Sequence, residues 1–374
     1  MKILITGICG FAGSVLARTL LEHQPGLQLT GIDNLSRKGS ETNLEPLRQC
    51  GIPVHVGDIC DPAALGVLVP ADYIIDCAAN PSVLAGVDGR SSSLSVIQQN
   101  LYGTVNLLEI CKSWNAGFIL LSTSRVYSIP PLATLPLSET DSRFAPVFRP
   151  QDSQQTSGNV QVVTGIPGLS SGGVSEAFPT AAPISLYGSS KLCSEALALE
   201  YGSTFGFPVW INRCGVLAGA GQFGKADQGI FSYWIHSWKS GRPLRYIGFG
   251  GSGKQVRDCL HPKDLVGIIL QQLKSQPEEC GRIRNLSGGI NNSMSLLELS
   301  AWCHHRFGPS RSEVDLSHSD ANESRPFDIP WLVLDSSMAA SKWNWKPSTR
   351  LNDVLEEIAS HAESHPDWLD LVSG

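Results

Sequence analysis

The sequence predicts an α/β protein with a doubly wound parallel sheet followed by a smaller C-terminal lobe. Two observations predict the sheet. Short apolar segments alternate with helical patterns through the first half of the chain, and the first apolar segment runs directly into a glycine-rich turn. The lobe is expected because 374 residues are more than one such sheet needs.

The expected elements follow from hydrophobic periodicity. Strands are expected at residues 2–6, 27–32, 53–56, 73–77, 117–122 and 208–212, where apolar residues form short runs. Helices are expected over residues 12–22, 95–114 and 187–201, where apolar residues recur at helical spacing. Strands that alternate with helices form parallel sheets with right-handed crossovers.

A segment rich in Pro, Ser and Gly interrupts this pattern from residue 128 to 185. Such a stretch is typical of a functional loop near an active site or of a partly mobile flap. We therefore expect a first domain over residues 1–213 that carries an insertion at about 128–185. The remaining residues, 214–374, form the lobe, except that about 258–285 return to the first domain.

The composition is that of an ordinary globular protein, with 42% hydrophobic and 17% charged residues. A net charge of −6 argues against a nucleic-acid or membrane partner, which would favour a basic surface. No apolar run is long enough to cross a membrane, and the apolar N-terminus is interpreted as a buried strand and not as a signal peptide. The ten cysteines show no CxxC or metal-ligand spacing, so we expect a reduced, cytoplasmic protein without a metal.

The turn after the first strand reads Gly7-x-x-Gly10-x-x-Gly13 and directly precedes a helix. Glycine permits a tight turn and close approach of a phosphate, and the helix N-terminus attracts its negative charge. Asp33 stands 20 residues after Gly13, at the end of the second strand, where a carboxylate can accept hydrogen bonds from a ribose. These residues predict a Rossmann-type dinucleotide site. Asp33 would repel a 2′-phosphate and favours NAD, although Arg37 and Lys38 keep NADP as an alternative.

Tyr187 and Lys191 stand four residues apart in a predicted helix, so their side chains lie one above the other. An ammonium beside a phenol favours the phenolate and lowers the pKa of the phenol. A tyrosine of this kind can take a proton from a sugar hydroxyl while a nicotinamide takes the hydride. Thr123 ends a strand and is placed to hydrogen-bond the same oxygen. Taken alone, the Tyr–Lys spacing is also that of an ordinary amphipathic helix.

These motifs, together with the helix that contains Asn100-Leu-Tyr-Gly-Thr, occur in the order found in one enzyme family. The chain resembles the extended short-chain dehydrogenase/reductases, which include the nucleotide-sugar epimerases and dehydratases. Within that family, stretches at residues 33–43, 212–216, 221–225, 253–261 and 325–331 resemble the CDP-tyvelose (CDP-paratose) 2-epimerases. The resemblance implies NAD as cofactor, a CDP- or UDP-linked sugar as substrate, and a homodimer formed through the helices at 95–114 and 187–201.

The resemblance also assigns residues to the cofactor. It implies that Asp58 and Ile59 contact the adenine, that Ala78 and Ala79 border the nicotinamide, and that Asn100 supports that wall. From the residues alone, Asp58 could equally cap the helix that begins near residue 62. The candidate cofactor residues are Gly7, Gly10, Phe11, Gly13, Asp33, Asn34, Asp58, Ile59, Ala78, Ala79, Asn100, Ser122, Tyr187 and Lys191.

The residues after Thr123 favour one chemistry over another. Sugar dehydratases of the family typically continue with Asp and Glu, which serve as acid and base, whereas this chain has Ser124 and Arg125. Arg125 cannot act as a proton shuttle at neutral pH. Oxidation followed by re-reduction is therefore favoured over elimination of water.

The diphosphate of a nucleotide-sugar needs cationic partners, and arginine matches phosphate geometry. Arg257 is the first candidate, with a salt bridge to Asp258 or Asp264 as the alternative role, and Arg325 is the second. The candidate substrate residues are Ser124, Arg125, Asn212, Gln222, Lys225, Arg257 and Arg325.

We therefore hypothesise an NAD-dependent nucleotide-sugar epimerase in which Thr123, Tyr187 and Lys191 are catalytic. The resemblance places the inverted carbon at C2. A UDP-sugar 4-epimerase, a 4,6-dehydratase or reductase, and a non-catalytic NAD(H) sensor are the alternatives.

Overall fold

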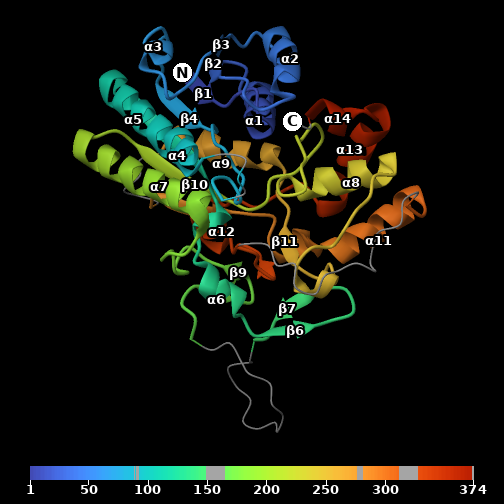
Figure 1. The fold of residues 1–374 in the computed structure, drawn as a ribbon. Coiled ribbons are helices and arrows are strands. Elements are labelled where there is room, and N and C mark those ends of the chain that lie inside the picture. The colour runs from blue at the N-terminus through green and yellow to red at the C-terminus, as the bar shows by residue number, and fades with distance from the viewer. Residues whose placement is uncertain (88, 90–91, 149–164, 276–280, 311–326, 373–374) are drawn as a thin grey trace.

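A seven-stranded parallel sheet forms the centre of the molecule (Figure 1). The computed structural model describes residues 1–87, 89, 92–148, 165–275, 281–310 and 327–372. All neighbouring strands are parallel, and the order reverses at the centre of the sheet, as a doubly wound fold requires. In spatial order the strands are β12 (Ile283–Leu286), β10 (Val209–Cys214), β5 (Gly117–Thr123), β4 (Tyr73–Asp76), β1 (Lys2–Thr6), β2 (Gln28–Asp33) and β3 (Val54–Val56).

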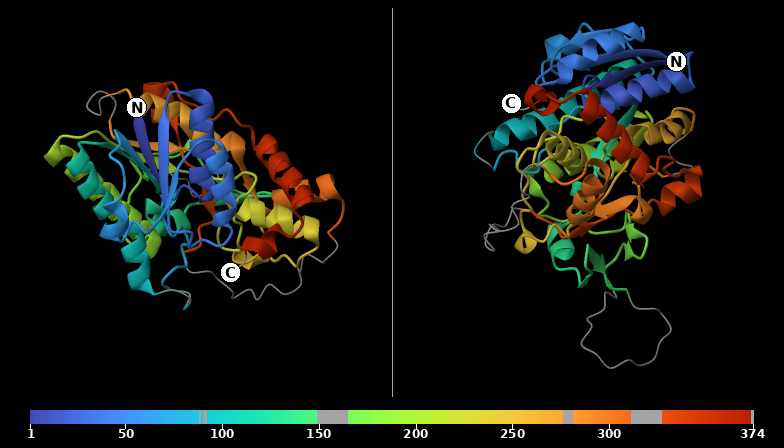
Figure 2. Two further views of the ribbon diagram at one scale, coloured as in Figure 1. Left: turned by 90° about the horizontal axis from the view of Figure 1, so that it is seen from above. Right: turned by 90° about the vertical axis from the view of Figure 1, so that its right-hand side faces the viewer.

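Helices cover both faces of the sheet, because its strands are apolar on both sides (Figure 2). One face packs against α1 (Phe11–His23), α2 (Leu44–Gln49), α9 (Leu265–Gln272) and α12 (Ser337–Trp343). The other packs against α3 (Pro62–Leu65), α5 (Gly103–Trp114) and α7 (Ser185–Phe205). The predicted α/β class is confirmed, and β12 with α9 adds the last strand and a covering helix from the second half of the chain.

The helix expected over residues 95–114 is divided into three parts. It consists of α4 (Ser93–Ile97), a π-helical turn (Gln98–Tyr102) and α5. The π-helical turn carries Asn100, which is buried. Such turns are frequent at functional sites, and Asn100 lies behind the wall of the site described below, bonded to Asn80 of that wall.

The C-terminal lobe has its own core, in which large aromatic side chains predominate. Its helices α8 (Ile230–Ser240), α11 (Leu296–Phe307) and α13 (Leu351–Ser364) bury their apolar faces together, and α14 (Trp368–Val372) packs on a small neighbouring cluster. A three-stranded sheet lies beside them, in the order β13 (Ser293–Ser295), β11 (Val256–Asp258) and β14 (Trp331–Leu332). Within the described residues, no helix is both long and apolar enough to cross a bilayer.

The described part of the predicted insertion forms short elements at the end of the molecule drawn lowest in Figure 1. Backbone hydrogen bonds join it to the chain near β14, including one from Val174 to Val333 at 2.9 Å. The insertion therefore packs on the lobe, through α6 (Ile129–Ala133), the hairpin of β6 (Leu137–Glu139) and β7 (Phe144–Pro146), and the hairpin of β8 (Leu169–Ser170) and β9 (Gly173–Val174).

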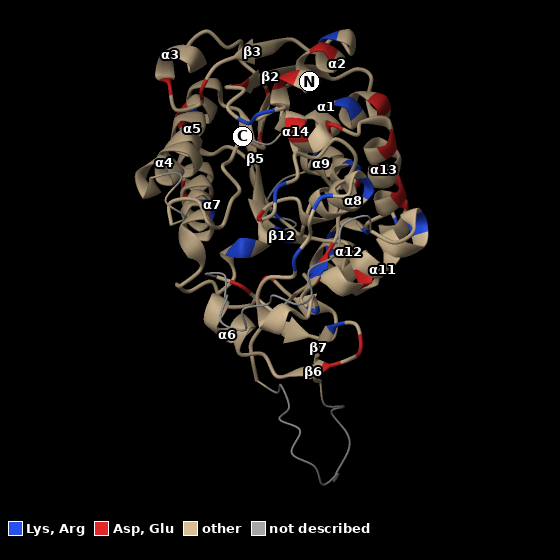
Figure 3. Ribbon diagram, turned by 45° about the vertical axis from the view of Figure 1, so that its right-hand side comes forward, with Lys and Arg blue, Asp and Glu red and all other residues tan. Residues whose placement is uncertain are grey.

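The carboxyl ends of the parallel strands meet at one edge of the sheet, facing the lobe. A cavity of about 920 Å³ lies at this edge, lined by residues that follow β1, β2, β4, β5 and β10 and by residues of the lobe. Figure 3 shows basic positions on segments that run between the sheet and the lobe. The candidate site is therefore built where the strands end.

Candidate active site

The glycine turn forms the floor of one end of the cavity. Gly7 has a φ of +59°, and a Cβ there would lie 2.8 Å from the Cα of Ala78. A Cβ on Gly13 would lie 2.3 Å from the carbonyl oxygen of Gly7. The turn therefore depends on glycine for its conformation and for the close packing of α1 against β1. The N-terminus of α1 then faces the cavity, where it can bind a diphosphate.

Asp33 lies at the end of β2 beside this turn, in the position that a ribose-binding carboxylate needs. Its two oxygens accept hydrogen bonds from the backbone nitrogens of Cys9 at 2.9 Å and Leu35 at 2.8 Å. Burial raises the pKa of Asp33, and these backbone bonds oppose that rise. Asp33 thus ties the glycine turn to the end of β2, with its side chain on the cavity wall.

Asp58 also lines the cavity and does not cap a helix. Its carboxylate accepts hydrogen bonds from the Cys60 nitrogen at 2.8 Å and from the Asn34 amide at 2.9 Å. The residue that caps α3 is Asp61, whose side chain accepts from the Ala63 nitrogen. The capping role considered for Asp58 is therefore wrong, and its carboxylate is held on the cavity wall by Cys60 and Asn34.

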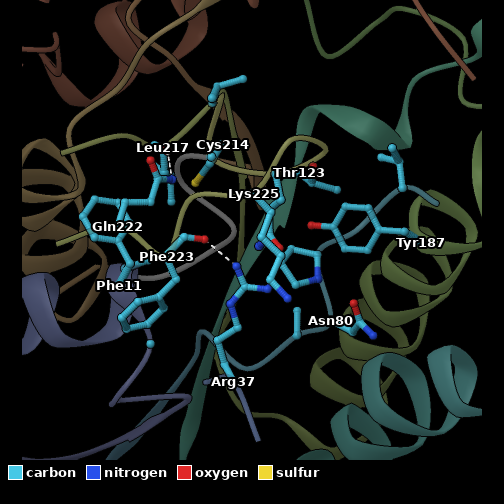
Figure 4. Close-up of a pocket in the computed structure, with 18 of the residues that line it drawn as sticks. Phe11, Arg37, Asn80, Thr123, Tyr187, Cys214, Leu217, Gln222, Phe223 and Lys225 are labelled. Carbon is cyan, nitrogen blue, oxygen red and sulfur yellow. Dashed lines mark hydrogen bonds between the residues drawn. The ribbon is translucent and has the colours of Figure 1, made fainter. Parts of the chain in front are cut away.

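Arg37 points across the cavity to the opposite wall (Figure 4). Its guanidinium donates a hydrogen bond to the backbone carbonyl of Phe223. Lys38 donates at 3.4 Å to the carbonyl of Asp370, in α14. Both cations thus bind backbone groups of other segments, and the binding of the adenosine ribose by Asp33 stays a prediction.

Asn100 joins the nicotinamide wall to the helix that carries Tyr187. Its side chain accepts from the Asn80 nitrogen at 2.7 Å and donates to the Asn80 carbonyl at 3.1 Å and to the Ser190 hydroxyl at 3.2 Å. Ala78 and Ala79 lie just before Asn80 on the same wall and line the cavity. Asn100 therefore supports the segment that carries Ala78, Ala79 and Asn80, and the contact of this segment with the nicotinamide stays a prediction.

Thr123 and Tyr187 meet at the centre of the cavity. Thr123 ends β5, Tyr187 lies in the first turn of α7, and both line the cavity, close enough for the Thr123 hydroxyl to lower the pKa of Tyr187. Figure 4 shows the phenol oxygen of Tyr187 pointing into the cavity. Lys191 is one turn further along α7 and only 1% exposed, beneath the cavity wall.

The net direction of the Tyr187 pKa differs from the expectation drawn from sequence spacing. Burial raises the pKa of Tyr187 to about 12, and the nearby Thr123 hydroxyl and the charge of Arg125 oppose that rise only in part. The spacing to Lys191 predicted a lowered pKa, but spacing carries no information on burial. For Tyr187 to ionise near neutral pH, nearby positive charge must more than cancel the effect of burial on its pKa.

A buried ion pair supports the strand ends behind Thr123. Glu195 of α7 accepts hydrogen bonds from the Arg213 guanidinium, the shortest at 2.6 Å, and from the Ser122 hydroxyl at 2.5 Å. Burial alone would lower the pKa of Arg213, but its bonds to Glu195 and Tyr127 outweigh burial and raise it. This network joins β5, β10 and α7, the three elements that position Thr123 and Tyr187.

Two arginines occupy the end of the cavity nearest the lobe. Arg257 lies 3.8 Å from Asp328 and donates to the Val256 carbonyl at 2.7 Å. Asp258 and Asp264 use their carboxylates elsewhere, so the alternative salt bridge to either of them is not formed. Arg125 donates at 3.4 Å to the Phe327 carbonyl. Both guanidinium groups line the cavity and can meet a phosphate.

Residues 222–229, which we call the strap, cross the cavity between its two ends. Besides the bond from Arg37, the strap is held by a 2.6 Å bond from Ser82 to Asp227 and a 3.0 Å bond from Trp368 to the Gln222 carbonyl. Gln222 and Lys225 line the cavity as expected, whereas the bonds to Phe223 and Asp227 were not foreseen. The strap therefore contacts both the NAD end and the sugar end.

Most predicted site residues line this one cavity, and a few do not. Asn212 was expected to bind substrate, but it is fully buried in β10 and exchanges two hydrogen bonds with Gln272. Arg325 lies outside the described residues. Asn80, Cys214, Met294 and Asp328 line the cavity and were not predicted as site residues, although Cys214 and Asp328 lie in stretches that carry the resemblance. The described residues hold no cluster of metal ligands.

The β6–β7 hairpin of the insertion braces the lobe side of the cavity. Arg143 donates to Glu298 at 2.7 Å and to the Ser293 carbonyl at 3.0 Å. Glu298 also completes a capping box with Ser295 at the start of α11. Ser295 and its neighbours Met294 and Leu296 line the cavity. The hairpin thus fixes the wall that faces the substrate end, without entering the cavity itself.

A dinucleotide groove that ends beside a Thr–Tyr–Lys group defines an NAD-dependent enzyme that oxidises a substrate alcohol. The comparison with protein families agrees. The model of the NAD dependent epimerase/dehydratase family matches residues 3–152 and 161–286, and the chain belongs to this family. NAD is its cofactor, and the glycine turn, Asp33, Ala78 and Ala79 line the cavity in which it is expected to bind.

Known proteins similar to the chain are nucleotide-sugar enzymes. The CDP-paratose 2-epimerase of Salmonella typhi is 31% identical, over 96% of this chain and 98% of its own length. A structure of UDP-glucuronic acid 4-epimerase from Bacillus cereus, in complex with UDP-glucuronic acid and NAD, has a TM-score of 0.73 at 24% identity and covers 97% of this chain and 99% of its own. The dTDP-glucose 4,6-dehydratase of Bacillus anthracis, in complex with NAD, has a TM-score of 0.68 at 19% identity, with both chains fully covered.

Proposed function

We propose that the protein is a nucleotide-sugar 2-epimerase of the CDP-paratose/CDP-tyvelose type. The observation that carries the proposal is that Thr123 and Tyr187 line the cavity together beside the glycine turn, with no acidic side chain in the two positions after Thr123. The 31% identity to a CDP-paratose 2-epimerase over nearly the whole chain supports this choice of substrate. The lack of an acid–base pair argues against elimination of water.

The residues divide the work as follows. Bound NAD supplies an acceptor for a hydride and returns that hydride later. Tyr187 takes the proton from the sugar hydroxyl, and Thr123 orients the same oxygen. Arg257 binds the diphosphate and keeps it fixed while the oxidised sugar turns. Tyr187 then returns the proton when the opposite face of the sugar is reduced, so the reaction has no net redox change.

Incubation of the purified protein with CDP- and UDP-sugars in deuterated water tests this mechanism. We expect the inverted carbon, identified by NMR, to be C2 and to remain unlabelled, because the hydride returns within the site. Deuterium at that carbon would contradict the mechanism, and stoichiometric accumulation of NADH would indicate a dehydrogenase. Inversion at C4 of a UDP-sugar would instead establish a 4-epimerase, the nearest alternative.

The variant Tyr187→Phe tests the catalytic assignment. It removes the proton acceptor and leaves the groove unchanged, so we expect a loss of several orders of magnitude in rate with NAD still bound. Unchanged activity would refute the role of Tyr187. If the parent protein converts no nucleotide-sugar, but binding of NADH changes its conformation, the NAD(H) sensor is supported instead.

We also propose a homodimer formed through α4, α5 and α7. Leu94, Tyr102 and Phe205 on or beside these helices are 63%, 48% and 42% exposed, so these helices offer apolar side chains to a partner. Light scattering coupled to size exclusion measures the mass. Tyr102→Glu with Phe205→Glu should give a monomer if these residues form the interface.

A further inference from the structure

Tyr187 is surrounded by groups that disfavour its ionisation. The phenol is 8% exposed, and its helix packs against β5 and the segment that follows β5. Cys214 of β10 and Cys77 after β4 lie on the same cavity wall, and burial raises the pKa of both thiols, so they remain neutral at physiological pH. The charges that can favour a phenolate are therefore those of Lys191 and of the segment after β5.

Arg125 stands on that segment, next to the first turn of α7. Its backbone nitrogen donates to the Thr123 hydroxyl at 3.1 Å. Its carbonyl oxygen packs so closely against α7 that a Cβ on Gly188, the residue after Tyr187, would lie 2.3 Å away. Thr123, Arg125 and Tyr187 all line the cavity. The backbone geometry therefore fixes Arg125 beside both groups that contact the reacting oxygen.

The Arg125 guanidinium has few partners of its own. Its hydrogen bond to the Phe327 carbonyl, at 3.4 Å, is long. The neighbouring carboxylate, Asp328, pairs with Arg257 at 3.8 Å. Burial and the charge of Arg257 lower the pKa of Arg125 to about 10, which leaves it fully cationic near neutral pH. Two half-buried cations thus lie near one carboxylate, which pairs with Arg257, and excess positive charge lines the cavity.

We propose that Arg125 is a second cation that acts on Tyr187 alongside Lys191, favouring the phenolate that accepts the proton of the sugar hydroxyl. Arg125 acts through Tyr187 and is a positioning residue, whereas Arg257 binds the diphosphate. This inference rests on the proposed function for its use in turnover, but the interaction of Arg125 with Tyr187 exists without any substrate. The effect of Arg125 on the pKa of Tyr187 can therefore be measured without substrate and without turnover.

The test is an ultraviolet titration of the phenol in the NAD-bound protein. The phenolate absorbance of each protein is measured against pH, and the curve of the matching Tyr187→Phe protein is subtracted so that only Tyr187 is seen. Arg125→Gln removes the charge but keeps a donor for the Phe327 carbonyl, and Arg125→Lys keeps the charge. We expect the Tyr187 pKa to rise by about one in Arg125→Gln and to stay within a few tenths of the parent value in Arg125→Lys.

Arg257→Gln is the matched control, because it removes the neighbouring buried cation from the diphosphate site. We expect it to weaken CDP-sugar binding while the Tyr187 titration stays close to that of the parent protein. An Arg125→Gln curve that superimposes on the parent curve would overturn the proposal. So would an equal shift in Arg257→Gln, because the effect would then be general and not specific to Arg125.

If the protein epimerises its substrate, the pH profile gives a second readout. A rate that needs the phenolate rises with pH through the Tyr187 pKa, so a raised pKa moves that limb to higher pH. With its Tyr187 pKa higher by about one, Arg125→Gln should be about tenfold slower on the acidic limb and regain the parent rate at high pH. A uniform loss at every pH would refute an action through Tyr187. Absence of epimerase activity together with a raised Tyr187 pKa in Arg125→Gln would refute only the proposed substrate.

Discussion

Removal of Arg213 should destabilise the protein far more than removal of a surface arginine. Arg213 and Glu195 are 5% and 2% exposed, and the guanidinium makes bonds of 2.6 to 3.1 Å to both carboxylate oxygens. In Arg213→Met the Glu195 carboxylate keeps only the Ser122 hydroxyl as a side-chain partner. An uncompensated buried charge of this kind costs about 3–5 kcal/mol.

The reverse change, Glu195→Leu, should cost a similar amount, because Arg213 then keeps only the Tyr127 hydroxyl at 3.3 Å and the face of the Tyr127 ring. The double variant removes both charges together. Because an apolar pair of similar volume often replaces a buried ion pair at little cost, we expect the double variant to be about 2–4 kcal/mol more stable than the sum of the single effects predicts.

The assay is urea unfolding of the NAD-free proteins, followed by both tryptophan fluorescence and circular dichroism to test that the transitions coincide. Arg306→Met is the control. Arg306 pairs with Glu356 and Glu363 on the surface, where such pairs contribute about 1 kcal/mol or less. A cost below about 1 kcal/mol for Arg213→Met, or additive single effects, would refute the reasoning that the pair is held in a low-dielectric interior.

Three further predictions concern a glycine of the turn, two buried histidines and an arginine of the β6–β7 hairpin. Gly13→Ala places a Cβ 2.3 Å from a carbonyl oxygen of the turn and should weaken NAD binding at least about 100-fold by calorimetry, whereas Gly26→Ala, with no atom within 4 Å, should not. Burial lowers the pKa of His236 to about 3 and that of His361 to about 4, so both are neutral in the folded protein but become protonated in the unfolded chain below pH 6.5. The free energy of unfolding should therefore fall on acidification, by on the order of 2 kcal/mol per histidine between pH 6.5 and 5. Thermal midpoints measured against pH should show this fall, and a flat curve would contradict it; His236→Gln should reduce it. Arg143→Met removes the bond that holds Glu298 beside the cavity, so KM for the nucleotide-sugar should rise about five- to tenfold while the affinity for NAD stays unchanged. An equal loss of NAD affinity would show a general structural defect.

The sheet and the NAD groove could be predicted because their signals are local. Apolar runs and the glycine spacing specify β1, the turn and α1 within the first 23 residues, and Asp33 follows at the end of the next strand. Parallel strands then bring their carboxyl ends to one edge, so Thr123 had to lie near the turn although it is far away in sequence.

The substrate end could not be predicted to the same depth. The strap and Asp328 belong to loops whose positions depend on long-range packing, and no periodicity places them. Asn212 was misplaced because a strand that is buried on both faces gives no indication of which side chain reaches a cavity. The direction of the Tyr187 pKa was wrong for a related reason, since burial depends on neighbours that the spacing to Lys191 does not describe.

The strap has a consequence for the order in which ligands leave the protein. Two of its bonds come from Arg37 and Ser82, on the NAD side, while its inner surface faces the sugar end. If the dinucleotide lies between the glycine turn and the strap as proposed, we expect its release to break the strap's bonds to Arg37 and Ser82. A smaller sugar nucleotide is expected to exchange from the lobe side without breaking them. We expect each NAD molecule to serve many catalytic cycles, as a resident group and not as a co-substrate.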